Sequence, residues 1–286
     1  MFLPVMARLA VEVGWRWAAL VVSALALALV PLVLLLLADH PRDVGARPYG
    51  APDEDDEPLP TTGSAQVRPA RAAVRGLVDA ARTSTFWLLA GTFFICGWST
   101  NGLIGTHFVP AAHDHGMPVT TAAGLLALIG VFDIVGTVGS GWLTDRVDAR
   151  LLLVTYYALR GLSLLVVPSL LGPAVRPNLF LFVVFYGLDW VATVPPTVAL
   201  CRQHFGLERS AVVFGWVYAS HMVGAGIAAT FAGTVRERTG TYQAAWLTAG
   251  ALCLLAAAAV LAIRGADGRR GARVRPPRPE PVAVGG

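Results

Sequence analysis

Long apolar runs separated by short polar breaks dominate this chain. Seven of them are long enough to cross a bilayer, at about residues 17–37, 86–110, 122–142, 151–171, 179–199, 212–233 and 243–263. A membrane-spanning helix needs about 20 apolar residues, whereas a strand of a membrane barrel needs about ten. Backbone groups in hydrocarbon must find partners inside their own segment, so runs of this length predict helices. The fold class predicted is all-α, a polytopic membrane helix bundle with about seven transmembrane helices.

Two segments interrupt this apolar pattern. Residues 39–85 hold six prolines and the acidic run Asp53–Glu57, and residues 265–286 are rich in arginine and proline. Neither segment can bury a core, so both are expected to be disordered and cytoplasmic. Between Arg68 and Arg82, arginines alternate with alanines, which is typical of an amphipathic helix at a membrane surface. The predicted organisation is an N-terminal segment 1–38 with one transmembrane helix, a charged loop 39–85, a six-helix membrane domain 86–264 and a tail 265–286.

Composition and charge placement agree with a membrane protein. The chain is 55% hydrophobic and 14% charged, and its mean hydropathy is +0.61. All 22 basic residues are arginine, and the net charge of +4 is concentrated in loops and termini and not on one amphipathic face, so no face suited to nucleic acid is expected. With the long loop and the tail inside, sixteen of the 22 arginines are cytoplasmic, as the positive-inside rule favours. We expect an integral protein of the bacterial inner (plasma) membrane, in contact with membrane lipid, with a cytoplasmic C-terminus.

The sequence lacks the usual signatures of enzymes and cofactor sites. It contains no G-x-S-x-G, H-E-x-x-H or P-loop pattern, and its three cysteines are far apart. The triplet His113, Asp114 and His115 has ligand types that suit zinc or copper. Two histidines and one carboxylate in an expected loop form a weak set, however. We therefore expect no enzyme activity, no cofactor and no metal site.

Four ionisable residues lie near the middle of four different predicted spans: Asp133, Arg160, Asp189 and His221. A charged side chain at the bilayer centre costs about 2.5–3.5 kcal/mol on insertion scales, so each is a functional candidate. In one interpretation, an aspartate pairs with Arg160 and holds the bundle together. In another, a carboxylate or His221 carries a coupling proton while Arg160 or His221 contacts an anionic solute. In a third, these groups merely face a wet cavity.

Other polar and small residues bear on how the helices pack and bend. Asn101 lies in the polar patch Trp98–Gly102, where it either lines a cavity or bonds a neighbouring helix. Glycines recur in the third and sixth runs, and they allow helices to pack closely or to slide. Pro195 and Pro196 remove backbone donors and predict a kink in the fifth run, which suits a gate or a passive bend.

The third run ends in the sequence GSGWLTDRVDAR, residues 139–150. It resembles the G-x-L-x-D-R-x-G-R-R loop motif of the major facilitator superfamily, in the copy that joins helices 8 and 9 of the twelve-helix fold. The matching positions are Gly141, Leu143, Asp145, Arg146 and Arg150, whereas Asp148 and Ala149 replace the usual glycine and arginine. The resemblance implies that Gly141, Asp145, Arg146 and Arg150 form a cytoplasmic gating motif, whose charges pair in one state and separate in another.

The resemblance extends over nearly the whole chain. Gly14–Arg16 is similar to the start of helix 6, and residues 39–50 are similar to the start of the central loop, so the seven spans would be helices 6–12. The stretch Tyr156–Gly161 is similar to bacterial members that resemble monocarboxylate transporters. Helices 7, 8, 10 and 11 line the cavity of that fold, while helix 9 is peripheral. The resemblance thus implies a pathway for substrate or coupling ion through Asn101, Asp133, Asp189 and His221, and a structural pair or anion contact for Arg160.

The function implied by the resemblance is secondary active transport of a small organic solute by alternating access, as a symporter or antiporter. An organic anion is a candidate solute and a proton is a candidate partner. Helices 1–5 of the family fold have no counterpart here, so we expect the chain to be truncated at its N-terminus or to need a partner that supplies the N-terminal half. The alternative function is a non-transporting membrane scaffold or an inactive transporter remnant.

Overall fold

The computed structural model describes residues 2–38, 44–45 and 69–263. Within these residues, all regular secondary structure is helical. Seven segments in these ranges are long and apolar enough to cross a membrane, which confirms the predicted fold class. They are α2 (Trp15–Leu36), α4 (Ser84–Gly97) continued by η2 (Trp98–Ile104) and α5 (Gly105–Asp114), α6 (Val119–Thr144), α7 (Ala149–Leu170), α8 (Pro177–Asp189) continued by α9 (Val194–Phe205), α10 (Leu207–Thr239) and α11 (Gln243–Leu261).

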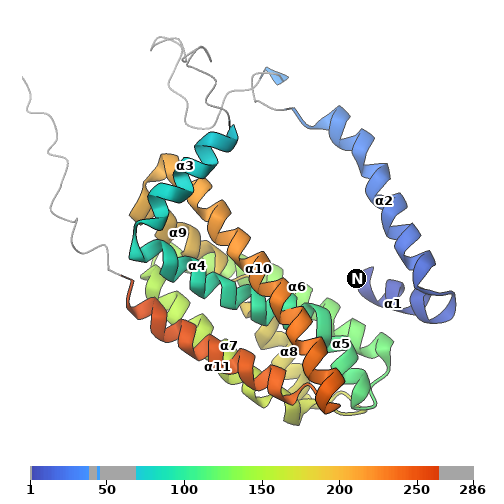
Figure 1. Cartoon of the computed structure of the whole chain (residues 1–286). Helices are drawn as coiled ribbons and strands as arrows, with labels where there is room; N and C mark the ends of the chain where they lie inside the picture. The colour runs from blue at the N-terminus through green and yellow to red at the C-terminus, as the bar shows by residue number, and fades with distance from the viewer. Residues whose placement is uncertain (1, 39–43, 46–68, 264–286) are drawn as a thin grey trace, which may run out of the picture.

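The six spans from α4 to α11 form one bundle (Figure 1). The closest helix pairs are α7 with α11, α4 with α10, and α6 with α8. Two apolar clusters fill the interior, one around Phe108, Tyr186 and Trp246, the other around Phe93 and Tyr157. Short connections join successive spans, so each span runs opposite to the one before it.

Close packing explains some of the glycines that the sequence places in these spans. A Cβ atom on Gly136 of α6 would collide with the backbone carbonyl of Leu188 in α8, and one on Gly224 of α10 would collide with that of Phe94 in α4. These glycines allow the paired helices to approach at backbone distance. A Cβ atom on Gly139 would meet nothing within 4 Å. Only part of the glycine pattern therefore reflects helix contact in this structure.

The N-terminal helices are placed differently from the bundle. Helix α1 (Phe2–Glu12) packs against α6, whereas α2 has no buried residue and stands apart from the bundle (Figure 1). Helix α2 is nevertheless the most apolar span of the described residues, with a hydropathy of 2.9. Its surface must be covered by lipid or by other helices, because exposed leucine in water is unfavourable.

The amphipathic helix expected between Arg68 and Arg82 is present as α3 (Pro69–Ala81). It lies beside α10 at one end of the bundle (Figure 1), and the Trp216 indole nitrogen donates to the Ala73 carbonyl oxygen at 3.0 Å. Residues 39–43, 46–68 and 264–286 lie outside the described residues. The domain boundaries and the predicted disorder of the loop and the tail stay predictions.

Two of the spans are not regular α-helices. The fifth is interrupted between Asp189 and Val194, just before the two prolines that predict a kink. Proline has no N–H to donate, so it fits the first turn of a new helix better than the middle of a continuous one.

The second span contains a π-helical segment, η2, which carries Asn101 and which the apolar pattern did not indicate. Such wide turns are rare and recur at functional sites.

Candidate functional site

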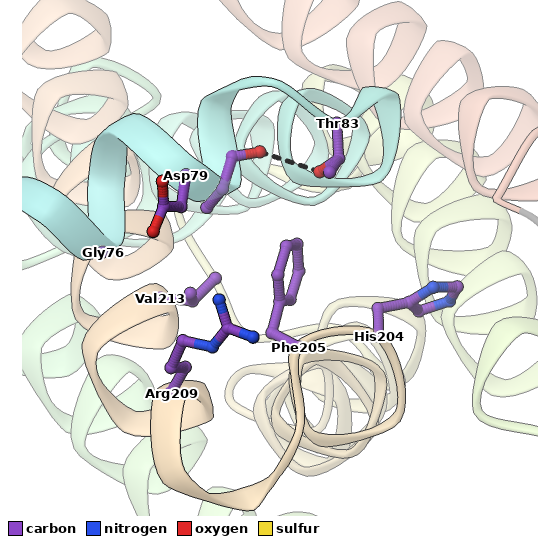
Figure 2. Close-up of a pocket in the computed structure, with 8 residues that line it drawn as sticks. Gly76, Asp79, Thr83, His204, Phe205, Arg209 and Val213 are labelled. Atoms are coloured by element: carbon purple, nitrogen blue, oxygen red, sulfur yellow. Dashed lines mark hydrogen bonds between the residues drawn. The ribbon is translucent and has the colours of Figure 1, made fainter.

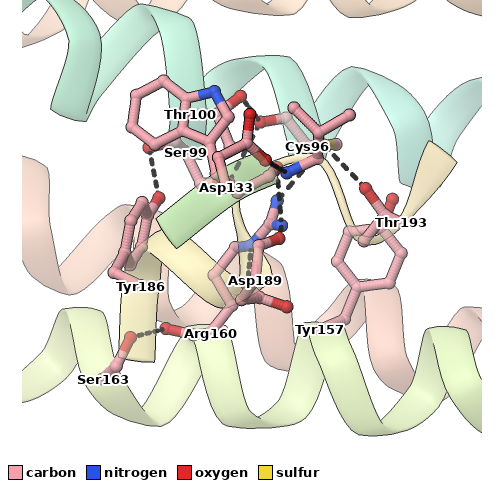
Figure 3. A network of polar contacts seen from close by, with 12 residues as sticks. Cys96, Ser99, Thr100, Asp133, Tyr157, Arg160, Ser163, Tyr186, Asp189 and Thr193 are labelled. Carbon is pink, nitrogen blue, oxygen red and sulfur yellow. Dashed lines mark hydrogen bonds and ion pairs between the residues drawn. The ribbon is translucent and has the colours of Figure 1, made fainter. Parts of the chain in front are cut away.

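The candidate site is the interruption of the fifth span, at residues 190–193. A broken helix frees backbone N–H and carbonyl groups, and each costs several kcal/mol if it is left without a partner in hydrocarbon. Side chains from α6 and α7 supply those partners (Figure 3). The sequence predicted the bend but not this arrangement.

Arg160 of α7 holds the end of α8. Its Nε donates to Asp189 Oδ2 at 2.5 Å, and one terminal nitrogen donates to the carbonyl oxygens of Asp189 at 2.5 Å and Trp190 at 3.2 Å. Arg160 is 0% exposed and Asp189 is 4% exposed. The guanidinium thus neutralises the carboxylate and also caps the negative C-terminal end of α8. Of the two aspartates predicted as partners for Arg160, Asp189 forms the ion pair.

Helix α6 contacts the other side of the interruption. Asp133 Oδ1 accepts from the Val191 N–H at 3.0 Å and from the Thr137 hydroxyl at 3.1 Å. Two α6 turns after Asp133, on the same face, the buried Ser140 hydroxyl donates to the Ala192 carbonyl oxygen at 2.5 Å. A half-buried carboxylate and a buried hydroxyl on one helix therefore hold two consecutive residues of the interruption, Val191 and Ala192.

Three further polar side chains surround the Arg160 guanidinium. Its second terminal nitrogen donates to the Cys96 sulfur at 3.2 Å, and that sulfur lies 3.3 Å from the Thr193 hydroxyl. The ring of Tyr157 has its centroid 5.9 Å from the guanidinium carbon, within the range of a cation–π contact. Neither Cys96 nor Tyr157 was predicted from the sequence as part of a functional site. Tyr157 stands three residues before Arg160, on the same face of a helix, and that spacing could have indicated it.

The two other predicted pathway residues do not join Asp133 and Asp189. His221 of α10 is buried, its ring stacks on Tyr218 at 5.4 Å, and it approaches the thiol of Cys96. Its Nδ1 has no hydrogen-bond partner among the residues that the structure describes. Asn101 in η2 is exposed on the outside of the bundle. Of the four predicted pathway residues, Asp133 and Asp189 thus lie at the interruption. His221 lies nearby, next to Cys96, and Asn101 lies away from it.

The loop motif between α6 and α7 has its own contacts. Asp145 and Arg146 are exposed, and Arg146 stacks over the Trp142 ring at 4.1 Å. Arg150 forms an ion pair with Asp148 at 2.8 Å and donates to the Ile263 carbonyl oxygen at 3.2 Å, which ties α7 to the end of α11. This guanidinium, which is hydrogen-bonded to Asp148, holds the pKa of that carboxyl below its ordinary value. The gating role of Gly141, Asp145, Arg146 and Arg150 stays a prediction.

These observations define an integral membrane protein whose helical bundle has one interrupted span held by polar side chains. The family model of the Major Facilitator Superfamily matches residues 1–206. That match covers more than half of the chain, which therefore belongs to the major facilitator superfamily, as the loop motif indicated. Membership of this family points to a transporter rather than an enzyme.

Monocarboxylate transporters are among the relatives of this chain. Monocarboxylate transporter 13 of Rattus norvegicus is 34% identical over 169 residues, which are 56% of this chain and 38% of the relative. Monocarboxylate transporter 12-B of Danio rerio is 32% identical over 174 residues, 58% of this chain and 35% of the relative. An uncharacterized MFS-type transporter of Bacillus subtilis (strain 168), YcxA, is 31% identical over 143 residues, 49% of this chain and 34% of the relative. The chain thus spans well under half the length of these relatives.

Proposed function

We propose that this chain is the helix 6–12 part of a secondary active transporter of small organic anions. The α8–α9 interruption carries this proposal, because side chains of two neighbouring helices hold its backbone groups. Interrupted spans of this kind recur where transporters bind solutes and ions. The names of the relatives favour a monocarboxylate as the solute class.

Asp133 is the residue that we assign to coupling. Its Oδ1 holds the Val191 N–H, while its second oxygen makes no hydrogen bond with any described residue. Its side chain is only half-buried, so that oxygen can take up a proton or face a solute. A change at the carboxylate would reach the interruption directly through Val191. Asp189 is already neutralised by Arg160, which favours a structural role for that pair.

The pathway is completed, in this proposal, by a second set of helices that faces Asn101 and Asp133. These helices belong either to a longer form of the chain or to a partner protein, and the membrane is the bacterial inner membrane with the C-terminus inside. Two observations support this view: Asn101 is exposed, and the match with this chain covers only 38% of the length of monocarboxylate transporter 13. The intact mass of the protein taken from its native membrane tests it: about twice the 30.1 kDa of this chain supports a longer form. A mass of 30.1 kDa with no co-purifying membrane protein contradicts the proposal.

Uptake measurements on the protein purified from its native membrane, with any co-purifying helices, test the role of Asp133. In vesicles with an imposed proton gradient, Asp133→Asn keeps an oxygen acceptor for Val191 but removes the charge. We expect gradient-driven accumulation of labelled lactate to fall by at least about tenfold, a change of about 1.4 kcal/mol or more, while exchange of internal for external lactate continues. The matched control is Asp79→Asn on α3, an exposed carboxylate away from the interruption. Unchanged accumulation in Asp133→Asn would refute the assignment.

A further inference from the structure

Helix α3 has an arginine face that points away from the bundle. Gly76 and Ala80 lie on its packed side, where a Cβ atom on Gly76 would come within 2.8 Å of the Val212 side chain. At 100° per residue, Arg71 and Arg75 lie about 40° apart on the opposite side, and Arg82 directly follows the last residue of the helix, Ala81. All three are exposed, and none forms an ion pair or side-chain hydrogen bond with another described residue. They form a stripe of three positive charges.

An apolar edge runs next to this arginine stripe. Val74 is 53% exposed and Val78 is 49% exposed, and both lie on one flank of the stripe. Trp87, at 63% exposed, extends the edge, because its indole nitrogen donates to the Ala81 carbonyl oxygen at 2.8 Å. An exposed tryptophan with one satisfied polar atom is typical of the membrane–water interface.

Helix α3 lies next to the start of a candidate membrane span. Thr83 lies two residues after the end of α3 and caps α4 by accepting from the Phe86 N–H at 3.3 Å, so α3 ends where a candidate membrane span begins. The hydrogen bond from Trp216 to Ala73 fixes α3 on α10. The exposed faces of α3 therefore have a fixed orientation relative to the bundle.

We propose that α3 is a binding surface for anionic phospholipid headgroups. Val74, Val78 and Trp87 lie against the upper parts of the acyl chains, while the arginines extend outward to the phosphates. A guanidinium matches two phosphate oxygens at once, which makes arginine suited to this contact. Each arginine near an anionic surface strengthens binding by about fivefold. This inference concerns lipid contact alone and holds whether or not the chain carries out the proposed transport.

The cavity on the other flank of α3 is a poorer candidate for the headgroup. It has a volume of about 190 Å³ between α3 and the α9–α10 turn. Asp79 and Arg209 face each other across it (Figure 2), so it presents both signs of charge to a bound anion. The arginine stripe carries one sign only, and it adjoins the exposed apolar edge of Val74, Val78 and Trp87.

Native mass spectrometry of the full chain tests the lipid preference. The chain is titrated with phosphatidylglycerol and with phosphatidylcholine of the same acyl chains. We expect retention of phosphatidylglycerol to exceed that of phosphatidylcholine by at least about tenfold, and the excess to disappear in a variant with Arg71→Gln, Arg75→Gln and Arg82→Gln. The matched control removes the same charge elsewhere, through Arg8→Gln, Arg16→Gln and Arg176→Gln, and should keep the excess. Equal retention of both lipids, or equal loss in both variants, overturns the proposal.

Spin labelling gives a second, independent test of the surface. The native cysteines are all buried, so a label on Val78→Cys reports on α3. In phosphatidylglycerol-containing vesicles we expect this label to be more accessible to dissolved oxygen than to a water-soluble nickel chelate. A label on Ala72→Cys, an exposed position on the cavity flank, should show the reverse order. If the nickel chelate reaches the Val78→Cys label as readily as the Ala72→Cys label, the apolar edge faces water. That result would overturn lipid binding and favour a soluble protein as the occupant of this surface.

Discussion

Arg160 of α7 and Asp189 of α8 form a fully buried ion pair whose guanidinium also caps the helix that carries its partner. The pair therefore neutralises two charges and closes the end of a broken helix with the same side chain. This double use explains how the carbonyls of Asp189 and Trp190 find a donor where the fifth span is interrupted. The interruption of the fifth span is therefore stabilised by a residue of another helix, Arg160 of α7.

Removal of Arg160 should destabilise the protein severely. Arg160→Ala leaves the Asp189 carboxylate and two carbonyls without their donor, and breaking a buried pair in this way costs about 3–5 kcal/mol. We expect a large fall in the thermal unfolding midpoint of the purified chain in detergent. Arg160→Ala combined with Asp189→Asn should recover part of the loss, because the uncompensated charge is gone.

Arg236 is the matched control for that experiment. It forms a bidentate pair with Asp114 at 2.7 Å, but its side chain is 44% exposed. Exposed pairs contribute about 0–1 kcal/mol, so Arg236→Ala should shift the midpoint little, and added salt should reduce the shift further. If the Arg160 and Arg236 variants lose stability equally, burial is not what gives the Arg160 pair its importance.

Ser140→Ala should cost stability through the carbonyl that it leaves without a donor. The Ala192 carbonyl oxygen accepts from the Ser140 hydroxyl in a buried position, and an unsatisfied buried acceptor costs about 1–3 kcal/mol. Ser169→Ala removes an exposed hydroxyl that bonds only within its own helix, so its thermal midpoint should stay near that of the unaltered chain. Equal midpoints for the two variants would show that water or lipid replaces the Ser140 hydroxyl at no cost.

Gly136→Ala should separate α6 from α8. The added methyl group would collide with the Leu188 carbonyl beside the interruption, and overpacking of this kind costs about 1–3 kcal/mol. In Gly139→Ala, one turn away on the same helix, the added methyl group meets nothing within 4 Å, so this substitution should be tolerated. Thermal unfolding of the two variants side by side decides the point. Tolerance of both substitutions would mean that the helices can part without loss.

Much of this fold followed from the sequence because bilayer thickness fixes the length of an apolar run. The seven spans, α3 and the bend before Pro195 were all predicted from local patterns. The choice of Asp189 over Asp133 as the partner of Arg160 was not, because it depends on how three helices rotate about their axes. The π-helical turn at Asn101 was also missed, since one extra residue per turn leaves the apolar composition unchanged.

The Asp148–Arg150 pair predicts a specific dependence of stability on pH. Asp148 caps α7 by accepting from the Arg150 N–H at 2.8 Å, and the Arg150 guanidinium lowers the pKa of its carboxyl in the folded state. A depressed folded-state pKa contributes stability fully above the unfolded value of about 3.9, and that contribution is lost as the pH falls through the folded-state pKa. Asp148→Asn keeps the capping oxygen but cannot titrate. Between about pH 6 and about pH 3, the unfolding midpoint should therefore fall further in the unaltered chain than in Asp148→Asn, and high salt should narrow the gap because the pair is partly exposed. Parallel pH profiles for the two proteins would show that Arg150 does not hold Asp148 ionised in solution.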